Sequence, residues 1–175
     1  MRRWLAVAVL VALAAGAAYW FLIRDTTVGG QLRAPRATAT IGSGEDAIAV
    51  GPNGRVLAWM PLPEELQLPE LPLSEPPQNG RLAGPVLQQA KVLGAAPATL
   101  RPYLESSYYG ESGIDVKLRS GIELRFGDAS QAAAKWRAAA AVLADPSITA
   151  LDYVNVIAPR RPSVGGSGHT LPPPE

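Results

Sequence analysis

Few residues of this 175-residue chain could carry catalysis. It has no cysteine and one histidine, His169, so thiolate nucleophiles, iron–sulfur clusters, cysteine zinc sites and paired-histidine metal sites are excluded. His169 lies in a segment rich in glycine and proline, where nothing in the sequence would hold it as the base of a serine hydrolase. We therefore expect no catalytic residue, no metal site and no cofactor site.

Paired carboxylates are the one catalytic class that the composition leaves open, because two acids in a cleft suffice for glycoside cleavage. The acidic residues available for such a pair are Glu105, Glu111, Asp115, Glu123 and Asp152. Two of them, Asp115 and Glu123, alternate with apolar residues in predicted strands, where a charged side chain normally faces solvent. The main expectation is a protein without enzymatic activity, and a membrane-anchored cell-wall hydrolase is an alternative.

The charge balance argues against nucleic acid as a partner. Sixteen basic and 15 acidic side chains leave a formal net charge of +1, which gives no strong field for binding phosphates. The glycine-rich stretch 165–168 lacks both the lysine and the strand–loop–helix context of a phosphate-binding loop. Neither nucleic acid nor a small-molecule substrate is expected to bind.

The N-terminal segment predicts a membrane protein. After a short tail, residues 1–3, twenty positions from Trp4 to Ile23 carry no charge, which is enough to span a hydrocarbon core of about 30 Å. Two arginines precede this segment, and the arginine that follows it is offset by an aspartate. This asymmetry places the N-terminus in the cytoplasm and the rest of the chain outside. A cleavable signal peptide, cut near residues 15–17, is the alternative.

The remainder of the chain divides by composition. Residues 24–46 have no sustained hydrophobic period and are expected to be a linker. Residues 47–164 are expected to form one folded extracytoplasmic domain, and residues 165–175 a disordered tail. Within the domain, residues 61–77 alternate leucine with proline and predict an extended covering loop.

A β-hairpin is the clearest local pattern. Residues 114–118 and 122–126 each alternate apolar and charged side chains, and the connection between them ends in Gly121. The other predicted elements are two helices over 84–94 and 129–144, the second capped by Asp128, and a final strand over 151–157. Together they predict the α+β fold class: one transmembrane helix followed by a mixed α/β domain.

The final strand, 151–157, is expected to be an edge strand that binds a partner by strand addition. If Val154 and Val156 pack against the core helix, the alternate residues of the strand face outward. Two arginines follow, and they can pair with acidic groups of a partner. The predicted partner-binding residues are Tyr153, Asn155, Ile157, Arg160 and Arg161.

Three motifs occur together in the C-terminal part of the chain. They are the stretch Gly121–Gly127 with glycine at both ends, a predicted helix containing Lys135, and residues 153–164, which read Tyr-Val-Asn-Val-Ile-Ala-Pro-Arg-Arg-Pro-Ser-Val. This combination resembles the end of the extracytoplasmic β domain of bacterial cell-division proteins of the FtsQ/DivIB family. The resemblance covers about residues 47–164, and the layout of the whole chain is similar.

The resemblance implies a bitopic, single-pass scaffold of the divisome in the plasma membrane at the division septum. Its outer domain would bind membrane proteins of the FtsB and FtsL type and help to control septal peptidoglycan synthesis. Two features depart from the family: Asn155 replaces the usual aspartate, and residues 24–46 are too few to form the family's POTRA domain. A generic secreted binding domain is the other alternative.

Overall fold

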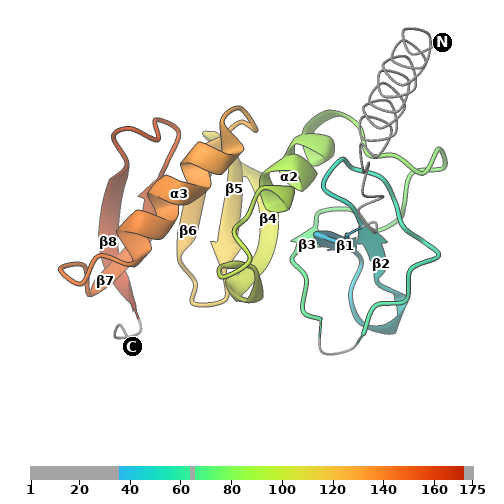
Figure 1. Ribbon diagram of the computed structural model, residues 1–175, viewed down its shortest axis with the longest axis horizontal. Helices are drawn as coiled ribbons and strands as arrows, with labels where there is room; N and C mark the ends of the chain where they lie inside the picture. The colour runs from blue at the N-terminus through green and yellow to red at the C-terminus, as the bar shows by residue number, and fades with distance from the viewer. Residues whose placement is uncertain (1–35, 64–65, 172–175) are drawn as a thin grey trace, which may run out of the picture. The chain divides into compact units, whose positions relative to one another are not determined.

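The computed structural model describes residues 36–63 and 66–171, which form one mixed β-sheet and two α-helices (Figure 1). The strand order is β2-β1-β3-β4-β5-β6-β7-β8. The strands are β1 (Ala39–Ile41), β2 (Ile48–Val50), β3 (Glu70–Leu71), β4 (Leu104–Gly110), β5 (Gly113–Leu118), β6 (Glu123–Gly127), β7 (Ala150–Asn155) and β8 (Ser163–Thr170). The helices are α2 (Gly84–Gly94) and α3 (Ala132–Leu143), with short 3-10 helices η1 (Gly44–Asp46) and η2 (Arg101–Tyr103).

The predicted fold class and location need correction. The sequence predicts an α+β domain behind a transmembrane helix, whereas the described residues form a mostly β unit, a single eight-stranded mixed sheet that carries two helices. Within residues 36–63 and 66–171, no helix is long and apolar enough to cross a membrane, so the single-pass membrane location is not supported. The predicted span, 4–23, and the predicted tail before it lie outside the described residues.

The hairpin predicted within residues 114–126 is confirmed. β5 and β6 pair antiparallel, with Val116 opposite Leu124 and Lys117 opposite Glu123. The apolar residues of both strands are buried in the hydrophobic core, and alternation turns their charged neighbours to the other face of the sheet.

At the other end of the sheet, the strands are short and pair with distant segments. β1 pairs antiparallel with β2 and parallel with β3, and Glu70 of β3 also pairs with Ser106 of β4. β1 lies inside the segment 24–46 that is expected to be a linker, so this expectation is wrong for residues 39–41. A strand of three residues shows too little alternation to be recognised from its own sequence.

Both helices cover the same face of the sheet (Figure 1). α2 begins and ends where the sequence predicts, at Gly84 and Gly94. The indole of Trp136 on α3 is fully buried, and its Nε1 donates a 2.7 Å hydrogen bond to the carbonyl of Val92 on α2. The Trp136 ring also lies 4.8 Å from the ring of Phe126 on β6, so this one side chain joins both helices to the sheet.

Lys135, beside Trp136, is a buried cation whose three protons all have acceptors. Its Nζ donates to the carbonyls of Phe126 at 2.8 Å and Asp128 at 3.1 Å, and to Asp128 Oδ1 at 2.7 Å. Because a buried ammonium group is tolerated only when it is fully paired, this cluster fixes the position of α3 relative to the end of β6.

α3 begins at Ala132 rather than at the predicted residue 129, because Asp128 does not cap it. Asp128 Oδ1 instead accepts hydrogen bonds from Lys135 and Ser130, and these bonds, the one from Lys135 first, lower the pKa of Asp128 to about 2. The residue before the helix, Gln131, has a φ of 51°, the left-handed conformation. Residues 128–131 therefore form a turn in place of the first helical turn.

The buried indole predicts the largest single-residue effect on stability. Trp136→Ala should lower the free energy of unfolding by about 3–5 kcal/mol, because it removes a fully buried aromatic group and leaves a cavity. Trp136→Phe should cost less, since the ring contact is largely retained and mainly the hydrogen bond to Val92 is lost. Urea unfolding measures both variants.

Trp59, which is 66% exposed, gives the control: Trp59→Ala should change stability by less than about 0.5 kcal/mol. Equal effects at the two tryptophans would contradict this role.

Candidate functional site

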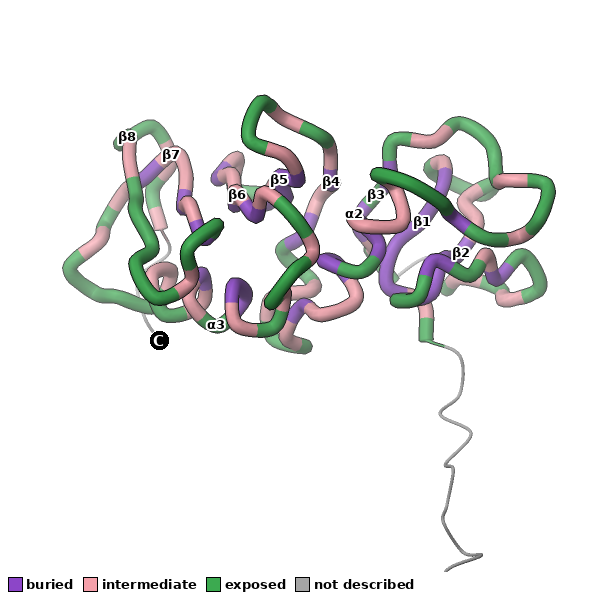
Figure 2. Tube along the Cα trace, turned by 90° about the horizontal axis from the view of Figure 1, so that it is seen from above, coloured by how far each residue is buried: buried purple, intermediate pink, exposed green. Residues whose placement is uncertain are grey.

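One edge of the sheet is β8, in a segment largely expected to be disordered. β8 is the last strand in the sheet order, and no described strand pairs with its outer side. Figure 2 shows β8 as exposed or half-buried along its length. The prediction of a disordered tail over 165–175 is therefore wrong for residues 165–170, and His169 lies in this strand opposite Leu151.

The glycines of β8 make room for side chains of β7. A Cβ atom at Gly165 would lie 2.6 Å from the hydroxyl oxygen of Tyr153, and one at Gly166 would clash with the carboxylate of Asp152. Asp152 Oδ1 in turn accepts a 2.7 Å hydrogen bond from the backbone N–H of Gly168. The glycine-rich composition is thus explained by close approach of β7 rather than by disorder.

β7 lies between β6 and β8, so the prediction that residues 151–157 form the sheet edge is wrong. Tyr153 and Asn155 are half-buried strand residues, and Asn155 Oδ1 accepts a 3.0 Å hydrogen bond from the N–H of Ile157. Ile157, which is 42% exposed, and the exposed Arg160 and Arg161 lie in the connection between β7 and β8. The structure places all five residues beside the free edge, and their binding of a partner stays a prediction.

The buried residues of β7 differ from those that simple alternation predicts. Between the pair Leu151–His169 and the pair Tyr153–Gly165, β7 has one residue and β8 has three, so the register shifts by two residues. Leu151, next to this irregularity, is buried in the core together with Val154, whereas strict alternation puts it on the outer face with Tyr153.

The backbone groups of Val164 point away from the sheet. The N–H of Val156 donates a hydrogen bond to the carbonyl of Arg125 on β6. The backbone groups of Val154 and Val156 therefore face β6, and those of Asn155, between them, face β8. Tyr153 and Asn155 therefore bond to Gly165 and Ser163, and Val164, between these two, presents its N–H and C=O outward. Its side chain is 43% exposed.

The face of the sheet opposite the helices carries a polar network. The Tyr108 hydroxyl donates a 2.6 Å hydrogen bond to Glu123 Oε1, and the Arg125 guanidinium lies 3.5 Å from Glu123 Oε2. Arg125 also stacks over the ring of Tyr153, 3.9 Å from its centroid. Because Tyr153 contacts Gly165 as well, the network extends from β4 to the edge strand and holds β8 in place.

Asp115 is a buried carboxylate in this network. It is 5% exposed, and its Oδ1 has no hydrogen-bond partner among the described residues. Burial raises the pKa of Asp115 to about 6, the negative charge of Glu123 adds to the rise, and Arg125 opposes it. Burial and the hydrogen bond to Glu123 likewise raise the pKa of Tyr108 above its usual value. Asp115 can therefore hold a proton near neutral pH.

Sequence reasoning missed Val164, Gly165, Arg125 and Asp115 as parts of this region. One usable signal was the stretch 159–162, whose prolines and arginines between two strand-length segments are typical of a hairpin connection. No sequence signal indicates that Asp115 is buried, because it alternates with apolar residues as an exposed strand residue does.

Neither a family model nor a curated protein matches this chain.

The contact between Tyr153 and Gly165 predicts strong coupling between the two positions. Gly165→Ala should lower the free energy of unfolding by about 1–3 kcal/mol, because the added methyl group displaces the Tyr153 ring. In a Tyr153→Ala background, the same substitution should cost much less. A double-mutant cycle of urea unfolding measures the coupling, and additive effects would show that the two groups do not meet.

Asp115 predicts a specific pH dependence of stability. Its folded-state pKa of about 6 lies above the value of about 4 for an unfolded chain, so between these values the folded protein binds more protons. The contribution of Asp115 to stability therefore falls as pH rises from about 4 to 6 and stays low at higher pH.

Asp115→Asn should remove this fall and raise the free energy of unfolding at pH 7.5 by about 1–3 kcal/mol relative to wild type. Urea unfolding at pH 4.5 and 7.5 measures it. The exposed Glu111, substituted as Glu111→Gln, should leave the wild-type profile unchanged. An unaltered profile in Asp115→Asn would contradict the assignment.

Proposed function

We propose that this chain is a non-enzymatic scaffold that binds a partner protein by strand addition to the free edge of β8. The observation that carries the proposal is the exposed edge itself, where Val164 turns both backbone groups away from the sheet. An extended partner segment could continue the sheet there, with its backbone supplying hydrogen bonds and its alternate side chains supplying specificity.

The surroundings of the edge support this proposal. Val164 is 43% exposed and Ile157 is 42% exposed, so apolar side chains lie where a docked segment would cover them. Arg160 and Arg161 are exposed in the connection that precedes β8 and suit acidic groups on the partner. Since exposed ion pairs contribute at most about 1 kcal/mol each, the arginines would favour the correct partner more than they increase affinity.

The motifs shared with the FtsQ/DivIB family suggest which partner this is. They comprise the stretch Gly121–Gly127, which contains β6, the helix lysine Lys135 and the segment 153–164. β6 pairs with β7, the segment 153–164 includes the contact of β7 with β8, and Lys135 holds α3 against the end of β6. We propose that the chain acts in bacterial cell division and links division proteins of the FtsB and FtsL type, with a part in controlling septal peptidoglycan synthesis.

Val164→Pro in the full chain tests the strand addition. Proline removes the outward N–H that a partner would use. It removes no hydrogen bond between β7 and β8, because the N–H of Val164 faces solvent, and proline is tolerated at such a position of an edge strand. We expect binding to an FtsB-type protein from the same organism to weaken at least about tenfold, measured by isothermal titration calorimetry.

The matched control is Val164→Ala, which shortens the side chain and keeps the N–H, and it should weaken binding far less than the proline variant. Urea unfolding of both variants verifies that the domain is intact. Wild-type affinity in a folded Val164→Pro protein would place the interface elsewhere.

A further inference from the structure

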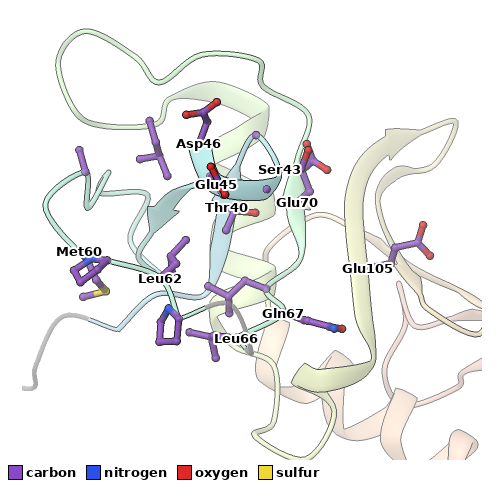
Figure 3. Close-up of a pocket in the computed structure, with 18 of the residues that line it drawn as sticks. Thr40, Ser43, Glu45, Asp46, Met60, Leu62, Leu66, Gln67, Glu70 and Glu105 are labelled. Carbon is purple, nitrogen blue, oxygen red and sulfur yellow. The ribbon is translucent and has the colours of Figure 1, made fainter.

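A second surface lies at the other end of the sheet, where a groove of about 1040 Å³ opens between two loops (Figure 3). Its floor includes Thr40 of β1 and Glu70 of β3, which pair in register. Since Leu71 is buried toward the helices, Glu70 points to the opposite face of the sheet. The groove is therefore on the face that the helices leave uncovered.

One wall of the groove is acidic. Glu45 and Asp46 project from η1, and Glu70 lies beside them on the floor (Figure 3). All three side chains belong to exposed residues, and none forms an ion pair with another described residue. The surrounding sequence is strongly biased as well, because residues 43–75 contain six acidic residues and one basic residue.

The facing wall is apolar and comes from the leucine–proline loop. Met60, Leu62 and Leu66 line it, and Figure 3 shows them across the groove from the acidic side chains. Leu66 is 47% exposed and Trp59, which also lines the groove, is 66% exposed. Apolar side chains of this size gathered at one surface groove are typical of a binding site.

From this arrangement we infer that the groove binds a peptide segment of a partner protein that carries lysine or arginine next to apolar side chains. Basic groups of the segment face Glu45, Asp46 and Glu70, and its apolar side chains pack on the loop with Leu66. None of the three carboxylates forms an ion pair with a described residue, and Arg119, which also lines the groove, donates through Nε to the carbonyl of Pro102. The acidic wall therefore favours a cationic occupant. A volume at the upper limit of small-molecule sites, open to solvent, suits a peptide.

This surface is independent of the proposed function. β3, on the groove floor, is separated from β8 by β4, β5, β6 and β7, so the two sites share no residue. Val164→Pro should leave binding at the groove unchanged, and substitutions in the groove should leave strand addition unchanged. Failure of one proposal is thereby distinguishable from failure of the other.

The test uses the full chain and a fluorescein-labelled peptide of alternating lysine and leucine, followed by fluorescence anisotropy. A peptide with glutamate in place of each lysine is the ligand control, and it should not bind. The combined variant Glu45→Gln, Asp46→Asn and Glu70→Gln should weaken binding of the lysine peptide at least about tenfold. These residues are exposed, so the variant should fold like wild type.

A matched charge control carries Glu75→Gln, Glu111→Gln and Asp145→Asn, three exposed acids outside the groove. It should change the affinity by less than about twofold. For the apolar wall, Leu66→Ser should weaken binding, whereas Tyr109→Ser, at a residue of similar exposure outside both sites, should not.

Three results would overturn the inference. The first is no binding of the lysine peptide to wild type, and the second is equal weakening by both combined acid variants, which would mean general attraction between opposite charges. The third is weakened binding with Leu66→Ser but wild-type binding with the combined groove variant, which would mean that the peptide is held by its apolar side chains and not by its charge.

Discussion

The packing of both helices on the sheet centres on the buried indole of Trp136, whose Nε1 donates a hydrogen bond to the carbonyl of Val92. Two described α-helices, α2 and α3, cover the eight-stranded sheet, and this hydrogen bond joins α3 to α2. The same indole packs on Phe126, so the helix pair and the centre of the sheet share one buried aromatic group. With all helical cover on one face, the other face must be stabilised in a different way.

Polar side chains perform that task on the uncovered face. Hydrogen bonds, an ion pair and a cation–π contact among Tyr108, Glu123, Arg125 and Tyr153 connect β4, β6 and β7. The arrangement has a cost, because it buries Asp115 without a hydrogen-bond partner for its Oδ1 among the described residues. The gain is that Tyr153 reaches Gly165, which allows a strand of poor intrinsic propensity to pair with β7.

The parts of the fold that sequence predicts are those whose signal is local. The alternation of 114–126 and the proline and glycine at the two ends of α2 each reside in a few consecutive residues, and both predictions are confirmed. β1 and β3 pair over long distances in sequence, with three and two residues, and give no periodic signal of their own. β8 is a strand only because Tyr153 and Asp152 fit against its glycines, information that lies in β7. Because β8 was not recognised as a strand, the sheet edge was wrongly assigned to residues 151–157, and the candidate site was misplaced by one strand.

The order of the strands also determines what the two surfaces can do together. β3 and β8 are separated by four strands, which at 4.7–4.9 Å per step places them about 24 Å apart across the sheet. A segment added at β8 would extend the sheet outward, away from the acidic groove, and a peptide in the groove would leave the β8 edge open. The two surfaces also differ in chemistry, since exposed arginines precede β8 whereas carboxylates line the groove. Opposite charge preferences at opposite ends of one sheet would allow two different partner segments to be held at once, as the proposed scaffold role requires.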